Sequence, residues 1–218
     1  MPEQEARRGL VVDWGGVLTG DMRTAMARWA AADGFPLDAF AAVVRDWSGR
    51  PDLAGEQGSP IPALERGELT TVDFEALLAE SLASRTGRSL EAAGLLDRLF
   101  EHVEREDDMV ALVRRARAAG LRTALLSNSW GNDYPRDGWD EMFDVVVISG
   151  EVGMRKPEPR IFEHTLLLLG LRPQECVFVD DLPLNVEAAA ALGIVGVRHR
   201  TYAATLVELE SLFGVALS

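Results

Sequence analysis

Short apolar runs that end in polar residues predict the strands of a sheet. Residues 10–13 form the first run, which stops at Asp13 and is followed by two glycines. We interpret this as a buried strand followed by a sharp turn. Four later runs have the same character, at residues 121–126, 143–148, 175–179 and 194–197.

Apolar residues three and four positions apart predict helices between these strands. They occur at residues 109–119, 159–169, 183–192 and 202–213. Strands that alternate with helices are typical of a parallel sheet covered by helices on both faces. We therefore predict an α/β fold with a Rossmann-like parallel sheet, formed by residues 1–20 and 105–218.

Residues 21–104 differ from the rest of the chain because they show helical spacing and no strand. Helices are predicted over 21–32 and 37–47, and further helices are predicted to start at Thr70 and Ser89. A helical stretch of about 85 residues is too long for a crossover between strands. We predict an inserted all-helical domain next to the strand end that carries Asp13.

A segment within this insert is rich in Gly, Pro and Ser, at residues 48–62. This composition predicts a long loop. We expect this loop to determine substrate choice, because Gly15 and the predicted core residues of the site do not distinguish one substrate from another.

Composition narrows the classes of function. The net charge is −13, and no basic run is present, which argues against a nucleic-acid partner. No stretch reaches the roughly 20 apolar residues that a membrane span needs, and the polar residues 1–8 do not resemble a signal peptide. We expect a cytoplasmic monomer or homodimer with no membrane partner.

One basic residue stands out from the others. Of 22 basic residues, 21 are arginine and one, Lys156, is lysine. A compact ammonium differs chemically from a guanidinium, so a chain biased to arginine that keeps one lysine suggests a specific role for it.

Four polar points lie at predicted strand ends or just beyond them, and in a parallel sheet these ends share one edge. Three carboxylates at one edge repel each other unless a cation neutralises them, and an oxygen-only site suits Mg²⁺. A lysine and a hydroxyl can then bind a phosphoryl group, and a carboxylate can attack phosphorus. The groups are Asp13, Ser127, Lys156 and the pair Asp180 and Asp181.

Four segments, in this order, resemble the motifs of the haloacid dehalogenase superfamily. They are DWGGVL at 13–18, LSN at 126–128, GMRKPEP at 153–159 and VDDLPLN at 179–185. The segment ERGEL at 65–69 also resembles a branch that includes bacterial glucose-1-phosphate phosphatases and the N-terminal phosphatase domain of soluble epoxide hydrolases.

The resemblance implies a role for each matching residue. Asp13 would be the nucleophile, and Ser127, Asn128 and Lys156 would bind the phosphoryl group, with Lys156 also acting in catalysis. Mg²⁺ would be held by Asp13, the backbone carbonyl of Gly15, and the pair Asp180 and Asp181. Residues 21–104 would be a cap that closes over a phosphorylated small molecule, with a sugar phosphate as the first expectation.

Gly15 departs from the pattern of the superfamily that the chain resembles. Most phosphatases of that superfamily carry a second Asp at this position, which acts as proton donor. Three alternatives stay open: a phosphatase that needs no such donor or has it elsewhere, a metal-free 2-haloacid dehalogenase, and a protein that binds phosphate or a partner without turnover. A dehalogenase needs no metal, so the adjacent Asp180 and Asp181 favour the phosphatase.

Overall fold

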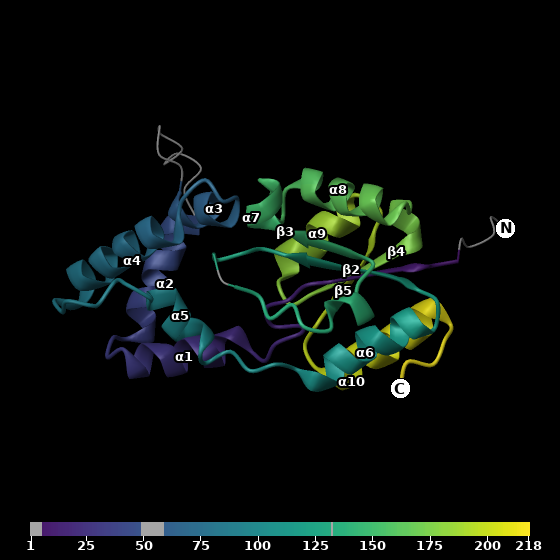
Figure 1. Cartoon of the computed structure of the whole chain (residues 1–218), viewed down its shortest axis with the longest axis horizontal. Coiled ribbons are helices and arrows are strands. Elements are labelled where there is room, and N and C mark those ends of the chain that lie inside the picture. Colours follow the sequence, from purple (N-terminus) through teal and green to yellow (C-terminus); the bar gives the residue numbers. More distant parts are fainter. Residues whose placement is uncertain (1–5, 49–58, 132) are drawn as a thin grey trace.

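The computed structural model describes residues 6–48, 59–131 and 133–218, and its centre is a parallel sheet of five strands (Figure 1). The strand order is β3-β2-β1-β4-β5, and every neighbouring pair is parallel. This confirms the predicted α/β class. The strands are β1 (Gly9–Val12), β2 (Arg122–Ser127), β3 (Val145–Ile148), β4 (Cys176–Asp180) and β5 (Val195–Arg198).

Helices cover both faces of the sheet because alternate strand residues are apolar on both sides. Leu10 and Val12 of β1 belong to a core shared with α6 (Asp107–Ala118) and α10 (Tyr202–Phe213). Val11 faces the opposite side and belongs to a core shared with the remaining two helices. These are α8 (Pro159–Leu169) and α9 (Pro183–Ala191).

Among the described residues, five helices lie between β1 and α6, and Figure 1 shows them beyond one end of the sheet. Their buried apolar residues, from Trp29 to Leu99, form a hydrophobic core of their own. The entering and leaving chain segments run side by side, since Thr19 and Arg105 form an antiparallel bridge. The helices are α1 (Met22–Ala32), α2 (Leu37–Ser48), α3 (Pro60–Glu65), α4 (Thr71–Thr86) and α5 (Leu95–Phe100).

This arrangement is the one expected of an insert at residues 21–104. That these residues act as a cap domain separate from the catalytic core stays a prediction, which we take up below.

Two predictions within the insert are wrong. The loop predicted over 48–62 includes the start of α3, because Pro60 and Pro62 favour the first turn of a helix; residues 49–58 of that loop lie outside the described residues. The helix predicted to start at Ser89 starts at Leu95 instead, after Gly94 in a left-handed conformation with φ of 69°.

Besides α3, three short elements of the described residues were not predicted, since none is long enough to show helical spacing. They are α7 (Ser149–Val152) and the 3₁₀ turns η2 (Trp139–Glu141) and η3 (Pro173–Glu175).

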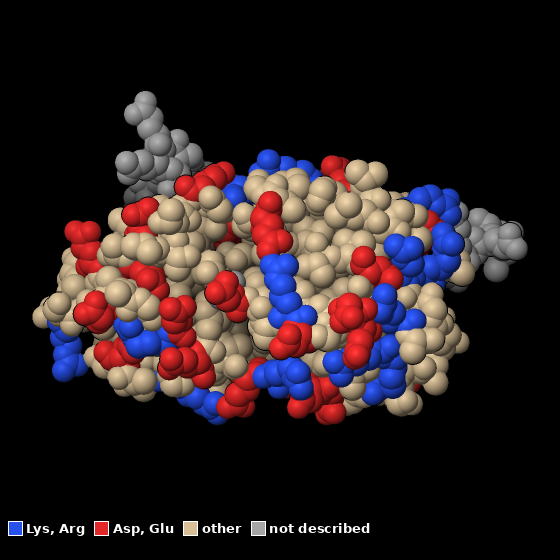
Figure 2. Space-filling view, in the orientation of Figure 1, with Lys and Arg blue, Asp and Glu red and all other residues tan. Residues whose placement is uncertain are grey.

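Charged side chains of both signs are spread over the surface shown in Figure 2, with acidic groups prominent over the inserted helices. Several acids pair with arginines, as Glu104 does with Arg28 and Asp46 with Arg85. Within the described part of the chain, no helix combines the length and the apolar character needed to cross a membrane.

Candidate active site

Asp13 lies one residue beyond β1 because the sheet continues to it. Its backbone N–H donates to the Val179 carbonyl at 2.9 Å, in the ladder between β1 and β4. The chain then turns back, with the Leu18 N–H donating to the Trp14 carbonyl at 2.9 Å. The side chain of Asp13 is therefore held at the carboxyl edge of the sheet, 11% exposed.

Gly16 is required at this turn for two reasons. Its φ is +70°, a conformation that residues with a Cβ rarely adopt. A Cβ there would also lie 2.7 Å from Oδ2 of Asp181. The glycine therefore lets the turn after β1 approach the carboxylate that follows β4.

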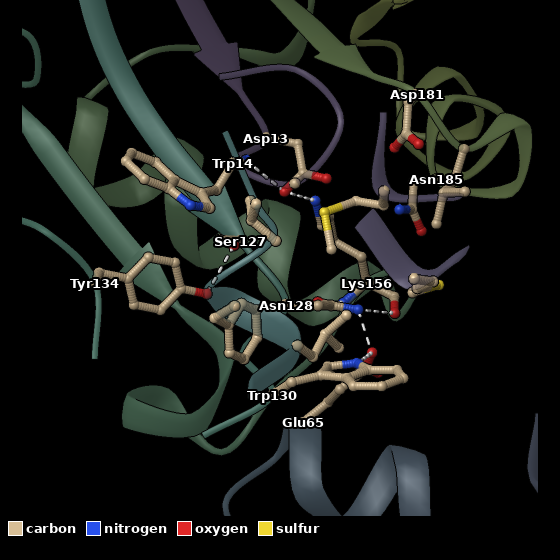
Figure 3. A pocket seen from close by; sticks show the side chains of 17 residues that line it. Asp13, Trp14, Glu65, Ser127, Asn128, Trp130, Tyr134, Lys156, Asp181 and Asn185 are labelled. Carbon is tan, nitrogen blue, oxygen red and sulfur yellow. Dashed lines mark hydrogen bonds and ion pairs between the residues drawn. The ribbon is translucent and has the colours of Figure 1, made fainter. Parts of the chain in front are cut away.

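Lys156 brings two of the carboxylates together. Its Nζ lies 2.8 Å from Oδ1 of Asp13 (Figure 3) and 2.7 Å from Oδ2 of Asp180. The lysine side chain is 1% exposed and Asp180 is fully buried. Burial alone lowers the pKa of the ammonium, but Asp13 and Asp180 outweigh it and raise the pKa, so Lys156 is charged.

Three groups donate hydrogen bonds to the carboxylate of Asp180: Lys156, the Leu182 N–H and the Asn185 amide. The Leu182 N–H donates to Oδ1 at 2.9 Å, and the Asn185 amide donates to both oxygens at 3.1 Å. Together with Lys156, these contacts fix the carboxylate in one orientation. Asn185 thus orders the acidic loop from the first turn of α9.

Asp181 completes a cluster of three acids. Asp13, Asp180 and Asp181 each present an oxygen such that these atoms lie within 4.8 Å of one another. Burial raises the pKa of Asp13 to about 7, with Lys156 opposing the rise and Asp180 adding to it. Burial and then Asp180 raise the pKa of Asp181 to about 6.

These residues fit a divalent cation. When all four groups are ionised, Lys156 neutralises one of the three carboxylates, and an excess of two negative charges remains in a buried space. The raised pKa values of Asp13 and Asp181 express the same need for added positive charge. Carboxylate oxygens at this spacing are ligands that suit Mg²⁺.

Asp13 has one oxygen that its neighbours leave available. Lys156 and the Trp14 N–H, the latter at 2.7 Å, both contact Oδ1. Among the described residues, no hydrogen-bond donor contacts Oδ2. Since two donors fix the orientation of the carboxylate, Oδ2 is the atom presented for attack or for metal binding.

Asn128 holds the backbone of Lys156 rather than presenting its side-chain amide. Its Oδ1 accepts from the Lys156 N–H at 2.8 Å, and its Nδ2 donates to the Lys156 carbonyl at 3.0 Å. Nδ2 also donates to Glu65 at 3.3 Å. Both amide hydrogens are thereby used, so the side chain positions the lysine. The predicted role of Asn128 in binding phosphate remains untested.

Glu65 links the inserted helices to this site. Its Oε1 accepts from Nε1 of Trp130 at 3.1 Å, and its Oε2 contacts Asn128 and forms an ion pair with Arg155. The resemblance placed Glu65 in a cap segment without giving it a contact. A signal was present, because Glu65 lies four residues after the buried Ile61 on the same face of α3.

Ser127 lies at the end of β2, 2% exposed, as its position predicts. Its hydroxyl is 2.9 Å from the hydroxyl of Tyr134. Burial raises the pKa of Tyr134 to about 12, so the phenol stays neutral and able to donate. Tyr134 was missed from the sequence, since it lies in a stretch without periodicity that carries no signal for it.

A cavity of about 250 Å³ lies against these groups. Asp13, Gly15, Ser127, Lys156 and Asp181 all line it, and Figure 3 shows the labelled side chains around it. Asn128 lines it as well, while Asp180 lies behind the surface of the cavity. The structure therefore gathers the predicted residues at one cavity, with Asp180 directly behind its lining.

Comparison with known proteins shows to which family the chain belongs. The model of the haloacid dehalogenase-like hydrolases matches residues 8–193. The chain is 31% identical over 217 residues to acyl-CoA dehydrogenase family member 10 of Mus musculus, covering 96% of this chain and 19% of that protein. It is 31% identical over 170 residues to bifunctional epoxide hydrolase 2 of Rattus norvegicus, covering 71% of this chain and 31% of that protein.

Two further similarities bear on the site and the fold. Over 111 residues the chain is 34% identical to the sesquiterpene phosphatase astK of Aspergillus oryzae, covering 49% of this chain and 56% of that protein. The fold is similar to a HAD family enzyme of Bacteroides thetaiotaomicron in complex with magnesium and inorganic phosphate. The TM-score is 0.60 at 20% identity, over 89% of this chain and 94% of the other.

Proposed function

Because the chain belongs to the haloacid dehalogenase-like hydrolase family, we propose that it is a magnesium-dependent phosphatase acting through a phosphoryl ester on Asp13. The observation that carries the proposal is the buried bridge of Lys156 between Asp13 and Asp180, with Asp181 beside it. A lone nucleophilic carboxylate would need no such cluster, whereas a bound phosphoryl group and a divalent cation both would.

Each side chain has a role in this proposal. Oδ2 of Asp13 forms the bond to phosphorus while the bond to the ester oxygen breaks, and that oxygen takes a proton from a water molecule. The hydroxide left by this water then attacks phosphorus and breaks the bond to Asp13, which releases inorganic phosphate and the free carboxylate. Lys156 and Ser127 contact the phosphoryl oxygens, and the lysine also keeps Asp13 in position.

Magnesium would be held by Asp13, Asp180, Asp181 and the Gly15 carbonyl, and it supplies the positive charge that lets an anionic ester approach the carboxylates. The inserted helices α1–α5 would act as the cap over the cavity. Their link to the core through Glu65 and Asn128 supports this role, because it connects the cap to the lysine.

The alternative is a 2-haloacid dehalogenase, and Gly15 is the observation that favours it, since a halide leaves without a proton. The cluster of Asp13, Asp180 and Asp181 argues against it. Without a cation, two buried carboxylates and one half-buried carboxylate beside a single ammonium repel one another, and a halide reaction would not use this repulsion.

The test measures phosphate release from p-nitrophenyl phosphate with Mg²⁺ and with EDTA. We expect Mg²⁺-dependent turnover that is lost in Asp13→Asn and retained in the matched control Asp137→Asn, an exposed acid that does not line the cavity. Metal-free halide release from a 2-haloacid would instead establish the dehalogenase. Vanadate binding without either activity would establish a binding protein.

A further inference from the structure

The cavity is lined by polar groups of the core and by apolar side chains of the inserted helices. The polar groups include Asp13, Asp181 and Ser127. The apolar wall is made largely by the inserted helices and the chain just after them. That wall consists of Met22 and Met26 from α1, Leu99 and Phe100 from α5, and Val103.

The apolar wall begins close to the reacting group. Met22 lies beside Gly15: a Cβ built on the glycine would be 3.7 Å from its Cγ and 3.9 Å from its Sδ. Thioether and methylene groups therefore occupy the space next to the turn that follows the nucleophile. A leaving group that departs from phosphorus into this part of the cavity meets carbon and sulfur.

Two polar side chains of the lining, Glu65 and Trp130, are already paired. Glu65 is the one charged side chain that the described residues of α1–α5 contribute to the lining, and its two oxygens are used by Trp130, Asn128 and Arg155. The single N–H of the Trp130 indole is used by Glu65 in turn. These contacts hold the cap on the core, and neither group is available to recognise hydroxyls of a sugar.

We infer that the cavity takes the phosphate monoester of a short aliphatic alcohol, and this rests on the proposed phosphatase function. Each hydroxyl buried without a partner lowers affinity by about five- to 150-fold. Each buried methylene instead raises it by about fourfold. The sugar phosphate implied by the resemblance is disfavoured by the same reasoning.

The size of the cavity sets the length of the alcohol. At roughly 30 Å³ for each water-sized group, the volume of about 250 Å³ holds about eight such groups. A phosphoryl group takes about half of them, leaving room for about four carbon atoms. Longer chains would project from the cavity and gain little from it.

The experiment compares kcat/KM for ethyl, butyl, hexyl and glucose 6-phosphate by phosphate release with Mg²⁺. We expect butyl phosphate to exceed ethyl phosphate by about fifteenfold, from two methylenes at about fourfold each. Hexyl phosphate should exceed butyl phosphate by less than fourfold, and glucose 6-phosphate should fall below butyl phosphate. A flat alkyl series, or a preference for the sugar, overturns the inference.

A substitution in the apolar wall tests whether this wall causes the preference for butyl over ethyl phosphate. Met26→Gln should reduce the butyl-to-ethyl ratio at least threefold, because it places an amide in the apolar part of the cavity. The matched control is Leu167→Gln on α8, where the leucine is 78% exposed, and its ratio should equal that of the wild type. An unchanged ratio in Met26→Gln contradicts the inference.

A binding measurement separates this inference from the proposed function. Calorimetry on Asp13→Asn with Mg²⁺ gives dissociation constants for butyl and ethyl phosphate without turnover. If the wild type does not cleave p-nitrophenyl phosphate but this variant binds butyl phosphate about fifteenfold more tightly, the proposed function fails and the inference stands. If p-nitrophenyl phosphate is cleaved and the two constants are equal, the inference alone fails.

Discussion

Replacing Lys156 with methionine tests the electrostatic basis of the site, since methionine has a similar length and no charge. The lysine is 1% exposed and contacts Asp13 and Asp180 at 2.8 and 2.7 Å. Removing one partner of a buried ion pair costs about 3–5 kcal/mol, because the remaining charges are left uncompensated. In a protein of this size each kcal/mol lowers Tm by about 2–4 °C.

We therefore expect Lys156→Met to unfold about 6–20 °C below the wild type in EDTA, followed by circular dichroism. The matched control is Arg28→Met, because Arg28 is 53% exposed and pairs with the exposed Glu104. An exposed pair contributes about 0–1 kcal/mol, so this control should change Tm little. If Tm falls by the same amount in both variants, the buried ammonium does not stabilise the cluster of Asp13, Asp180 and Asp181.

A second substitution separates charge from packing. Asp180→Asn alone should destabilise the protein, because it leaves the buried ammonium with one fewer carboxylate. In the Lys156→Met background the same change should cost less or even stabilise, because it removes a repelling charge. The coupling expected for such neighbours is about 0.5–3 kcal/mol, and a coupling near zero would contradict the assigned contact.

Three further outcomes follow from the site. Asn128→Ala should lower the free energy of unfolding by about 1–3 kcal/mol, because the backbone of Lys156 loses two contacts. For p-nitrophenyl phosphate it should lower kcat more than it changes KM. A change in KM alone would contradict this role of Asn128. Gly15→Asp should fold, because its Cβ would be in ordinary contact with Met22 at 3.7 Å. If proton donation limits the rate, this variant should raise kcat for alkyl phosphates by about 10²-fold or more. An unchanged kcat would show that proton donation does not limit the rate. Because the pKa values of Asp13 and Asp181 are raised from 3.8 to about 7 and 6, the native state holds more protons than the unfolded state between about pH 4 and 7, and stability without metal should fall as pH rises through that window. Thermal unfolding at pH 5 and 8 should then show a larger gain from Mg²⁺ at pH 8, and equal gains would contradict the metal assignment.

The sheet and its covering helices could be predicted because they follow from local pattern. Parallel strands buried on both faces appear as unbroken apolar runs, and glycine marks where several helices end. Gly170 illustrates this, since it follows α8 with φ of 65°. The start of α5 could not be predicted in this way. Its first N–H groups, those of Gly94 and Leu96, donate to Glu75 at 3.2 and 2.8 Å, and that acid lies on another helix.

The site was predictable where residue type and strand position coincide. Asp13, Ser127 and Asp180 lie at strand ends that the parallel topology brings to one edge, and Lys156 stands out as the one lysine. Tyr134 was not predictable, because its contact with Ser127 depends on the path of a loop that no local pattern describes.

Different parts of the fold hold the apolar and the polar side chains of the cavity. Met26 and Leu99 belong to the packing of the inserted helices, whereas Asp13 and Asp180 are fixed by the sheet and Lys156. We therefore expect substitutions in the apolar wall to change which ester is preferred without disturbing the carboxylates. Glu65 limits this independence, because its contact with Asn128 joins α3 to the residue that holds the backbone of Lys156. We therefore expect a displacement of α3 to loosen the contacts that hold Lys156 beside Asp13.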